Sequence, residues 1–514
     1  MSNATALFRS LLAYGICLPL AVFLGYLLAT PMDFTTVGVV VGVVFVLAIP
    51  LLLRWHHFWL VVAWNVNAVI FLLPGKPPVW IALVALSLGV SILQYTLNRN
   101  MMKFLSVPSV AWPLFLLTAV VLITMQFTGG FGIRSMGADT SGGRFYVEFL
   151  AAVLGYFAIT NRRIPSQRVG LYAACFFLGG VTTLISDLPG RVNPVFNFLF
   201  LFFPVSNAAV FLQTNDVIEH TSLVSRGGGL AASGSAVYIF MLARYGLRGV
   251  LDLAKPWRLA VLCVAIPLAL SGGYRSTFIV LTMTFAVLFY LERLHHTRWL
   301  LPVISMLLAG GSLTVLFAPS MPLSIQRSLA VVPFIPIDPL ARLDAEATTE
   351  WRIEMWRQLV PQIPKYLLLG KGYAFSRTEQ AQLSMSGGYR DTEMVANYHN
   401  GPLSIILPFG IFGLLAFIWL LVAGLRVLYQ NYRFGDPALH NINTLLFASF
   451  IVNAIYFFAV YGQFYLEMRT FLGLLAFGIS LNGGVAKPVV VPQPNIVFNR
   501  FKLHPSVRAP SVPG

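Results

Sequence analysis

The chain consists mostly of apolar blocks separated by short polar segments. Blocks such as Val37–Leu53, Trp299–Phe317 and Pro402–Val422 are uninterrupted by charge. Apolar runs of roughly 17–25 residues cross a bilayer as helices, because a helix satisfies its own backbone hydrogen bonds. The pattern therefore predicts an all-α protein, a polytopic transmembrane helical bundle.

Fourteen ranges are candidate spans, so we expect about 12–14 spans in all. A further apolar stretch, Val195–Leu212, is interrupted by Pro204 and is expected to lie in the membrane interface or to re-enter. The candidate spans are 11–29, 34–53, 58–73, 79–97, 109–127, 145–160, 168–186, 229–243, 257–271, 276–292, 299–318, 402–422, 441–461 and 465–482.

Composition supports a membrane protein. Only 10% of the 514 residues are charged and 57% are hydrophobic, whereas about 25% of residues are charged in a soluble protein. The net charge of +16 would suggest nucleic acid in a soluble chain. No dense Lys/Arg tract with interleaved aromatic residues occurs, so we exclude nucleic acid as a partner. The three cysteines, Cys17, Cys175 and Cys263, fall in apolar blocks and are interpreted as packing residues.

The distribution of Lys and Arg predicts the orientation. With the N-terminus inside, the cytoplasmic segments hold 19 of the 34 Lys and Arg residues, and the short outer loops and helix ends hold 7. Because short cytoplasmic loops are enriched in Lys and Arg, both termini are expected to be cytoplasmic. This orientation places a large loop, 319–398, outside the cytoplasm, between the fourth-last and third-last spans.

The spans and loops divide the chain into five regions. Within the outer loop we expect a helix over Glu350–Val360, ended by Pro361 and Pro364. Trp351, Met355 and Leu359 form an apolar stripe on it, which would lie on the membrane surface or against the bundle. The regions are an N-terminal transmembrane part (1–186), a central transmembrane part (187–318), the loop (319–398), a C-terminal transmembrane part (399–486) and a disordered cytoplasmic tail (487–514).

Two arginines lie next to glycines on the outer side, where positive charge is scarce. Arg275 follows Gly272 and Gly273 in a tight turn, and paired glycines permit unusual backbone angles and close approach of a ligand. Arg226 precedes three glycines at the start of a helix, whose uncovered N–H groups would favour phosphate. The alternatives are an interfacial arginine that reaches lipid headgroups for Arg275, and a flexible hinge with an incidental arginine for Arg226.

Arg352 and His399 are the other outer candidates. Arg352 shares a helix face with Trp356, four residues on, although an amphipathic surface helix explains the pair equally. His399 lies at the outer mouth of a span, and histidine accepts a proton near neutral pH. Its alternative role is helix capping. Asp391 and Glu393 lie nearby in sequence and are candidates to orient its ring.

Several motifs are absent from the sequence. There is no Walker A sequence, no GxGxxG, no Asp-x-Asp for a metal-bound nucleotide sugar, and no Cys/His cluster with zinc spacing. We therefore expect neither a cofactor nor a metal. No acid or base lies clearly at mid-span, which disfavours a proton-coupled transporter.

These short motifs, in this order, resemble the O-antigen ligase and polysaccharide polymerase superfamily. The resemblance covers roughly Leu223–Leu415 and does not extend to the N-terminal half. Its pieces are Ser225-Arg226-Gly227-Gly228-Gly229, Gly272-Gly273-Tyr274-Arg275-Ser276, Trp351-Arg352 with Trp356, Leu369-Gly370-Lys371-Gly372-Tyr373, and His399-Asn400 before Gly410-x-x-Gly413.

The resemblance implies a metal-independent, inverting glycosyltransferase at the outer face of a bacterial inner membrane. The donor would be a glycan on undecaprenyl diphosphate, and the acceptor a hydroxyl of a glycan, lipid or protein. Arg226 and Arg275 would hold the diphosphate, and His399 would be the general base. The candidate substrate-binding residues are Arg352, Tyr274, Trp356, Lys371, Tyr398 and Asn400.

Two other classes of function stay open. One is a transporter or flippase of lipid-linked oligosaccharide, which would need a charged path through the bundle. The other is a non-catalytic membrane component of a polysaccharide export complex. Membrane lipids surround the protein under every alternative.

Overall fold

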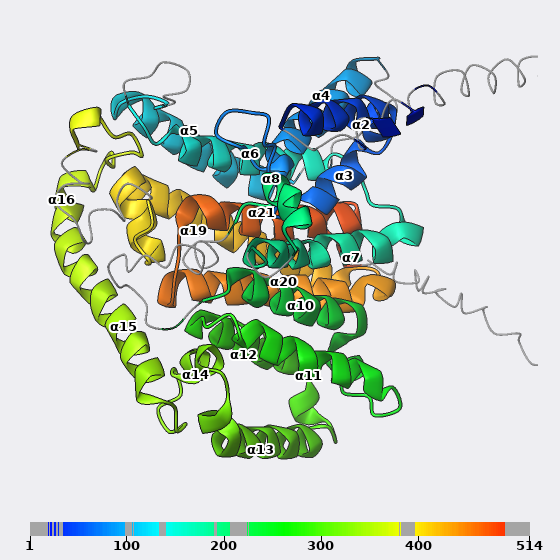
Figure 1. Cartoon of the computed structure of the whole chain (residues 1–514), viewed down its shortest axis with the longest axis vertical. Helices are drawn as coiled ribbons and strands as arrows, with labels where there is room; N and C mark the ends of the chain where they lie inside the picture. The colour runs from blue at the N-terminus through cyan, green and yellow to red at the C-terminus, as the bar shows by residue number, and fades with distance from the viewer. Residues whose placement is uncertain are drawn as a thin grey trace, which may run out of the picture.

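A computed structural model shows an all-helical protein (Figure 1). The structure describes residues 34–97, 107–132, 140–189, 193–205, 226–379 and 396–488, with isolated positions 19, 21, 22, 25, 26, 29, 105, 224 and 381. Within these ranges only two isolated β-bridges form, Val69 with Pro78 and Ser141 with Phe375. The predicted fold class, a helical membrane bundle, is confirmed.

Five helices form the centre of the bundle. Their apolar faces pack into one large buried cluster, and in α21 78% of the most apolar stretch is buried inside the protein. Bundle interiors of this kind need apolar residues on several faces of each helix. The central helices are α6 (Gly143–Thr160), α10 (Gly228–Val250), α19 (Gly401–Phe434), α20 (His440–Ala459) and α21 (Phe464–Asn482).

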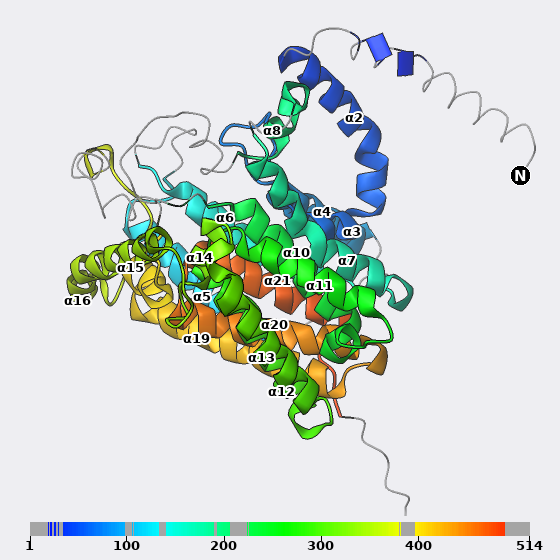
Figure 2. The same cartoon turned by 60° about the horizontal axis from the view of Figure 1, so that its bottom comes forward.

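Further helices surround this centre. Figure 2 shows α2 projecting from the bundle, and in α13 only 6% of the most apolar stretch is buried. Such exposed apolar helices suit contact with lipid. The outer helices are α2 (Phe34–Arg54), α3 (His56–Ala63), α4 (Val79–Leu97), α5 (Pro108–Phe127), α7 (Val169–Leu178), α8 (Leu199–Phe202), α11 (Pro256–Leu270), α12 (Arg275–Leu291) and α13 (Leu300–Phe317).

In the described residues, nine helical segments are long and apolar enough to cross a membrane, or ten if the bent pair α2 and α3 is one span. The helices α11 and α12 are apolar but shorter. Most of the fourteen predicted ranges therefore coincide with apolar helices. The predicted span 11–29 lies outside the described residues apart from isolated positions, and so does the second half of Val195–Leu212, whose first half forms a 3-10 turn and α8.

The predicted span 58–73 is wrong. The helix α3 ends at Ala63, and the chain continues in turns up to α4. The Asn65 side chain donates to the Phe176 carbonyl, and the Asn67 backbone donates to Thr182 Oγ1. Other helices thus satisfy the backbone and amides of this segment, which need not be helical. An apolar run alone does not distinguish a membrane-spanning helix from an irregular segment packed among other helices.

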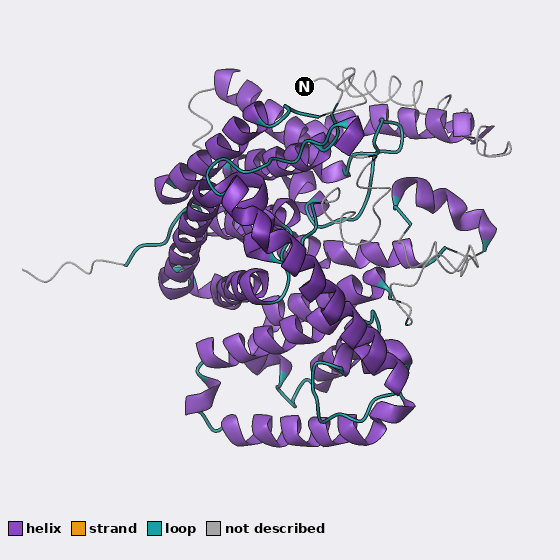
Figure 3. Cartoon of the chain, turned by 90° about the vertical axis from the view of Figure 1, so that its left-hand side faces the viewer, coloured by secondary structure: helices purple, strands orange, loops and turns teal. Residues whose placement is uncertain are grey.

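The loop before α19 carries a longer helix than the sequence predicted. Helix α15 spans Pro339–Leu359, because Asp338 caps its N-terminus by accepting from Leu340 N and Pro339 occupies its first turn. The prediction of Glu350–Val360 therefore started about three turns late. Helices α14 (Leu323–Leu329) and α16 (Ile363–Tyr366) flank it. Figure 1 shows α15 and α16 running along one side of the bundle, and Figure 3 views the molecule from that side.

The apolar stripe of α15 packs against the bundle. Met355 and Leu359 are buried with Tyr398, Leu403 and Leu407, at the start of α19. Of the two predicted positions for this stripe, the structure shows the second. This contact holds α15 against one end of the bundle. His399 lies at the same end, just before α19 begins.

Candidate active site

A cavity of about 830 Å³ lies where α14 and α15 cover the ends of α10, α12 and α20. Its wall combines basic and aromatic side chains with an apolar margin. The lining residues are Arg226, Tyr274, Arg275, Ser276, Ile279, Arg327, Val331, Ala347, Thr348, Thr349, Trp351, Arg352, His399, Tyr456, Ala459, Val460 and Tyr461.

Five of the nine predicted site residues line this cavity: Arg226, Tyr274, Arg275, Arg352 and His399. They come from four separate parts of the chain. They are brought together by the packing of α15 over the bundle and not by proximity in the sequence. These side chains, far apart in the sequence, therefore converge on one cavity in the structure.

The other four predicted residues lie outside the lining. Trp356 donates its indole N–H to the carbonyl of Tyr398 at 2.9 Å, and the Tyr398 side chain is buried beneath α15. Asn400 caps α19 by accepting from Leu403 N at 3.1 Å. The Lys371 ammonium lies 5.3 Å from the ring centroid of Phe375. Trp356, Tyr398 and Asn400 thus hold α15 and α19 in place around the cavity.

The turn at Gly370 and Gly372 has a structural role. Both glycines have positive φ angles, 81° and 69°. The amides of Lys371 and Gly372 donate to the carbonyls of Leu407 and Pro408, each at 2.9 Å. Helix α19 is broken at Gly410, so the loop pairs with backbone groups that the break leaves without helical partners.

Arg327 in α14 is a cavity residue that sequence reasoning missed. Its side chain is buried, with only 3% exposed. The guanidinium donates to the Asp344 carboxylate, to the Gly273 carbonyl and to Thr348 Oγ1. Its local sequence, Ile325-Gln326-Arg327-Ser328-Leu329, mixes polar and apolar residues and does not mark Arg327 as a site residue.

Asp344, also missed, links Arg327 to the predicted residues. Its carboxylate is 2% exposed and lies 3.4 Å from Arg226 Nη2. Arg226 also donates to Thr348 Oγ1 at 3.2 Å, one helical turn after Asp344. In the same helix, Thr349 Oγ1 accepts from Arg275 Nη2 at 2.9 Å. One face of α15 therefore holds three arginines from three other segments.

The helix N-terminus after Arg226 is not open to a ligand. Asp187 Oδ2 accepts from Gly229 N at 2.7 Å and from Leu230 N at 3.1 Å, and Gly227 N donates to the Gly272 carbonyl. The prediction that uncovered amides there would bind phosphate is wrong, because a carboxylate of the protein already occupies that position. An anion in this cavity would have to be held by side chains.

The glycines of both motifs allow the segments to pack closely. A Cβ on Gly229 would lie 2.4 Å from the Thr183 carbonyl oxygen, and one on Gly272 would lie 2.6 Å from Ala231 Cβ. Gly273 has a φ of 76°, which favours glycine. The glycines thus bring Arg226 and Arg275 together, and they do not make space for a ligand.

His399 sits between two aromatic rings at the mouth of α19. Its ring centroid lies 5.3 Å from that of Trp351 and 5.2 Å from that of Tyr461, both edge-on. Its φ is 48°, which few residues other than glycine adopt. Its Nδ1 is buried and has no hydrogen-bond partner among the described residues. Asp391 and Glu393, the proposed orienting residues, lie outside the described residues.

The electrostatics of the cavity are dominated by positive charge. Burial, followed by the charges of Arg352 and Arg226, lowers the pKa of His399 to about 4. Burial and the nearby Arg327 lower the pKa of Arg226, and burial lowers that of Arg352. His399 is therefore neutral at physiological pH and able to accept a proton. Among the described residues, four arginines and no carboxylate line the cavity, and Asp344 beside it pairs with Arg226 and Arg327, so the cavity carries a net positive charge.

Groups that would bind a metal are not gathered here. Within the described ranges, no three His, Cys, Asp or Glu side chains lie close enough together to hold a metal ion. The chemistry available in the cavity is anion binding by guanidinium groups and proton transfer by one imidazole.

Comparison with known proteins agrees with the motifs. Among curated proteins, none matches the chain. A match to a protein family covers residues 222–418, a range that contains Arg226, Arg275, Arg327, Arg352 and His399. The matched family is O-antigen ligase, so this multi-pass membrane chain carries an O-antigen ligase domain, and the resemblance seen in its sequence is confirmed.

Proposed function

We propose that the protein transfers or polymerises a glycan from an undecaprenyl-diphosphate carrier onto an acceptor hydroxyl. The single observation that supports this most is the convergence of four arginines and one neutral histidine in the 830 Å³ cavity. The reaction would take place at the outer face of a bacterial inner membrane, in the biosynthesis of a cell-surface polysaccharide or exopolysaccharide. ATP is not required, because the diphosphate linkage is already activated, and a metal is not required, because the arginines stabilise the leaving diphosphate.

The charge of the cavity suits this donor. A diphosphate esterified at both ends carries about two negative charges, and the lipid diphosphate that leaves carries close to three near neutral pH. The cavity supplies a net positive charge from four arginines. Arg226, Arg275 and Arg352 would contact the phosphate oxygens, and Arg327 would act through its bonds to Asp344 and Thr348. Guanidinium groups suit this role because they bind phosphate bidentately and stay charged.

His399 would act as the general base. Its imidazole takes the proton from the acceptor hydroxyl while the acceptor oxygen bonds to the anomeric carbon. The bond from that carbon to the phosphate oxygen breaks with its electron pair, so lipid diphosphate leaves and the configuration inverts. A base with a pKa of about 4 would become stronger when the diphosphate binds, because nearby negative charge favours the imidazolium.

The apolar margin fits a lipid carrier. Ile279 on α12, Val331 after α14 and Val460 after α20 line the cavity beside the arginines. The charged headgroup and the first prenyl units would therefore both find suitable surfaces. Tyr274, Trp351 and Tyr461 offer faces for sugar rings.

The decisive experiment reconstitutes the full chain in liposomes with a synthetic undecaprenyl-diphosphate glycan and candidate acceptors. We expect a glycosylated acceptor without ATP and in the presence of EDTA, and loss of product in His399→Ala and Arg275→Ala. Arg433→Gln is the control, because Arg433 is exposed at the far end of α19. If EDTA abolished transfer, or if both cavity variants kept full activity, the proposal would be rejected.

A transporter would give a different result in the same liposomes. Movement of a labelled lipid-linked glycan between leaflets, without any glycosylated product, would support the flippase. If cavity variants assembled a polysaccharide export complex and supported export as well as the wild type does, the non-catalytic alternative would be supported.

A further inference from the structure

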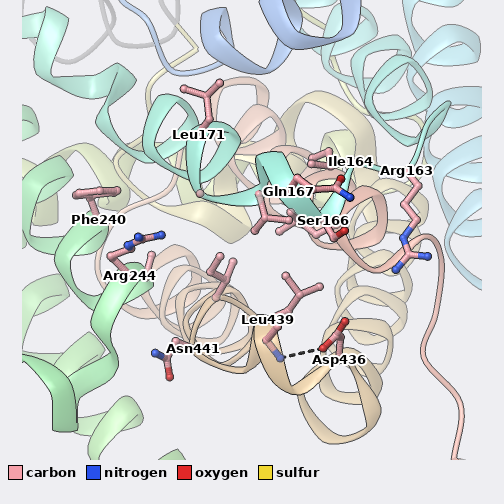
Figure 4. A pocket seen from close by; sticks show the side chains of 16 residues that line it. Arg163, Ile164, Ser166, Gln167, Leu171, Phe240, Arg244, Asp436, Leu439 and Asn441 are labelled. Atoms are coloured by element: carbon pink, nitrogen blue, oxygen red, sulfur yellow. Dashed lines mark hydrogen bonds between the residues drawn. The ribbon is translucent and has the colours of Figure 1, made fainter.

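A second cavity, of about 700 Å³, lies at the opposite end of the bundle from the candidate active site (Figure 4). Helix α20 relates the two, because Asn441 and Ile442 in its first turn line this cavity while Tyr456 and Ala459 in its last turn line the other. A helix of that length spans about 30 Å, close to the thickness of the hydrocarbon core. The second cavity therefore lies near the other surface of the membrane, the arginine-rich side predicted to be cytoplasmic.

Two arginines stand on opposite sides of this cavity, Arg163 and Arg244 (Figure 4). Both are exposed, and no hydrogen bond or ion pair joins either guanidinium to another described residue. The lack of a side chain at Gly170 leaves room for the Arg244 guanidinium, because a Cβ there would lie 2.9 Å from Arg244 Nη1. The guanidinium groups are therefore available to an anion.

Polar neighbours favour an anion further. Ser166, Gln167 and Asn441 line the cavity and can donate hydrogen bonds. Asp436 is the single acidic residue in the described lining, and its carboxylate accepts from Ala438 N at 2.9 Å as the cap of the following turn. The cavity thus has a net positive charge, and its one carboxylate is already engaged.

Apolar side chains complete the wall and narrow the choice of anion. They come from α7, α10, α20, α21, the segment before α7 and the 3-10 turn before α20. They are Ile164, Val169, Leu171, Phe240, Leu439, Ile442 and Leu481. A free phosphate would gain nothing from this surface, whereas an amphipathic molecule would contact both parts.

We propose that this cavity binds the phosphate headgroup of an anionic phospholipid from the adjacent leaflet. One arginine would contact the phosphodiester, the other would attract the anion from across the cavity, and the apolar wall would contact the glycerol and the start of the acyl chains. Basic pockets between helices on the cytoplasmic side are suited to such headgroups. This proposal does not depend on the glycosyl transfer at the other end.

The test measures lipid binding to the purified, delipidated chain in a neutral detergent by native mass spectrometry. We expect phosphatidylglycerol to bind about tenfold or more tightly than phosphatidylcholine. In the double variant Arg163→Gln, Arg244→Gln the two lipids should bind alike, while Arg433→Gln, at the same end of the bundle but outside the cavity, should keep the preference. The lysine double variant should retain most of it, because it keeps the charge.

Two outcomes would overturn the proposal. Equal binding of the two lipids by the wild type would show that the chain has no site for an anionic headgroup. An unchanged preference in the glutamine double variant would show that the two arginines do not form such a site. Competition by inorganic phosphate with the same affinity as phosphatidylglycerol would show a free-anion site, and the lipid assignment would be wrong. Unchanged thermal unfolding of the variants in detergent would show that any loss of binding is local.

Discussion

Asp344 provides a direct test of how α15 is held over the candidate active site. The substitution Asp344→Asn keeps the size of the side chain but removes its charge. Arg327, whose side chain is 3% exposed, would then lose its only ion-pair partner among the described residues, and Arg226 would lose one of its two bonds to α15. The perturbation therefore leaves a buried guanidinium without a counter-charge.

The expected magnitude follows from this burial. Breaking a buried ion pair by removing one partner costs about 3–5 kcal/mol. The contact to Arg226 is more exposed and longer, so it contributes about 1 kcal/mol or less. If this free energy is lost from the docking of α15 on the bundle, the equilibrium constant for detachment of α15 rises about 10²–10⁴-fold.

Hydrogen–deuterium exchange of the α15 amides measures this opening in the full chain. Asp338→Asn is the matched control, because Asp338 is an exposed cap of the same helix and asparagine caps equally well. We expect fast exchange over Pro339–Leu359 in Asp344→Asn and wild-type exchange in Asp338→Asn. If the two variants exchanged alike, Asp344 would not be what fixes α15 to the bundle.

Three further predictions concern catalysis and packing. His399→Ala should lower kcat by about 10²–10⁴-fold while the donor still binds, as measured by turnover and donor titration in parallel; equal loss of both would argue against a general base. Because His399 must be neutral to accept a proton, kcat/KM should fall as the pH drops through about 4. Arg352→Gln removes a charge that lowers this pKa, so the fall should begin at higher pH; an unmoved acid limb would contradict the assignment. Gly229→Ala should cost about 1–3 kcal/mol in thermal unfolding, because its Cβ would meet the Thr183 carbonyl. Gly310→Ala has open space and should not.

Much of the architecture was readable from apolar length. The helices α4, α5, α13 and α20 begin and end within a few residues of the predicted spans, because roughly 20 apolar residues have few other stable states in a membrane. The span predicted at 58–73 is wrong because apolar content, the criterion used for every span, indicates burial in lipid and burial in protein alike. Helix α3 stops at Ala63 because neighbouring helices supply partners to the residues that follow.

The candidate site was only partly readable. Arg226, Arg275 and His399 stood out because cations at outer span ends are scarce, but Arg327 and Asp344 lie in a loop whose local sequence carries no comparable signal. Tyr398 and Asn400 neighbour His399 in sequence, yet one packs under α15 and the other caps α19. Neighbouring residues in an irregular segment point in different directions, and only packing decides which one faces the cavity.

Read alone, the amino-acid sequence established that this is a helical membrane protein, where most of its candidate spans lie, and which motifs resemble those of the O-antigen ligases. Those properties depend on hydrophobic length and short-range pattern. Tertiary structure alone decided that Asp187 fills the helix N-terminus, that Asp344 gathers two arginines beneath α15, and that His399 faces them. These are contacts between residues far apart in the chain, and their energies depend on burial and distance, which no single segment encodes.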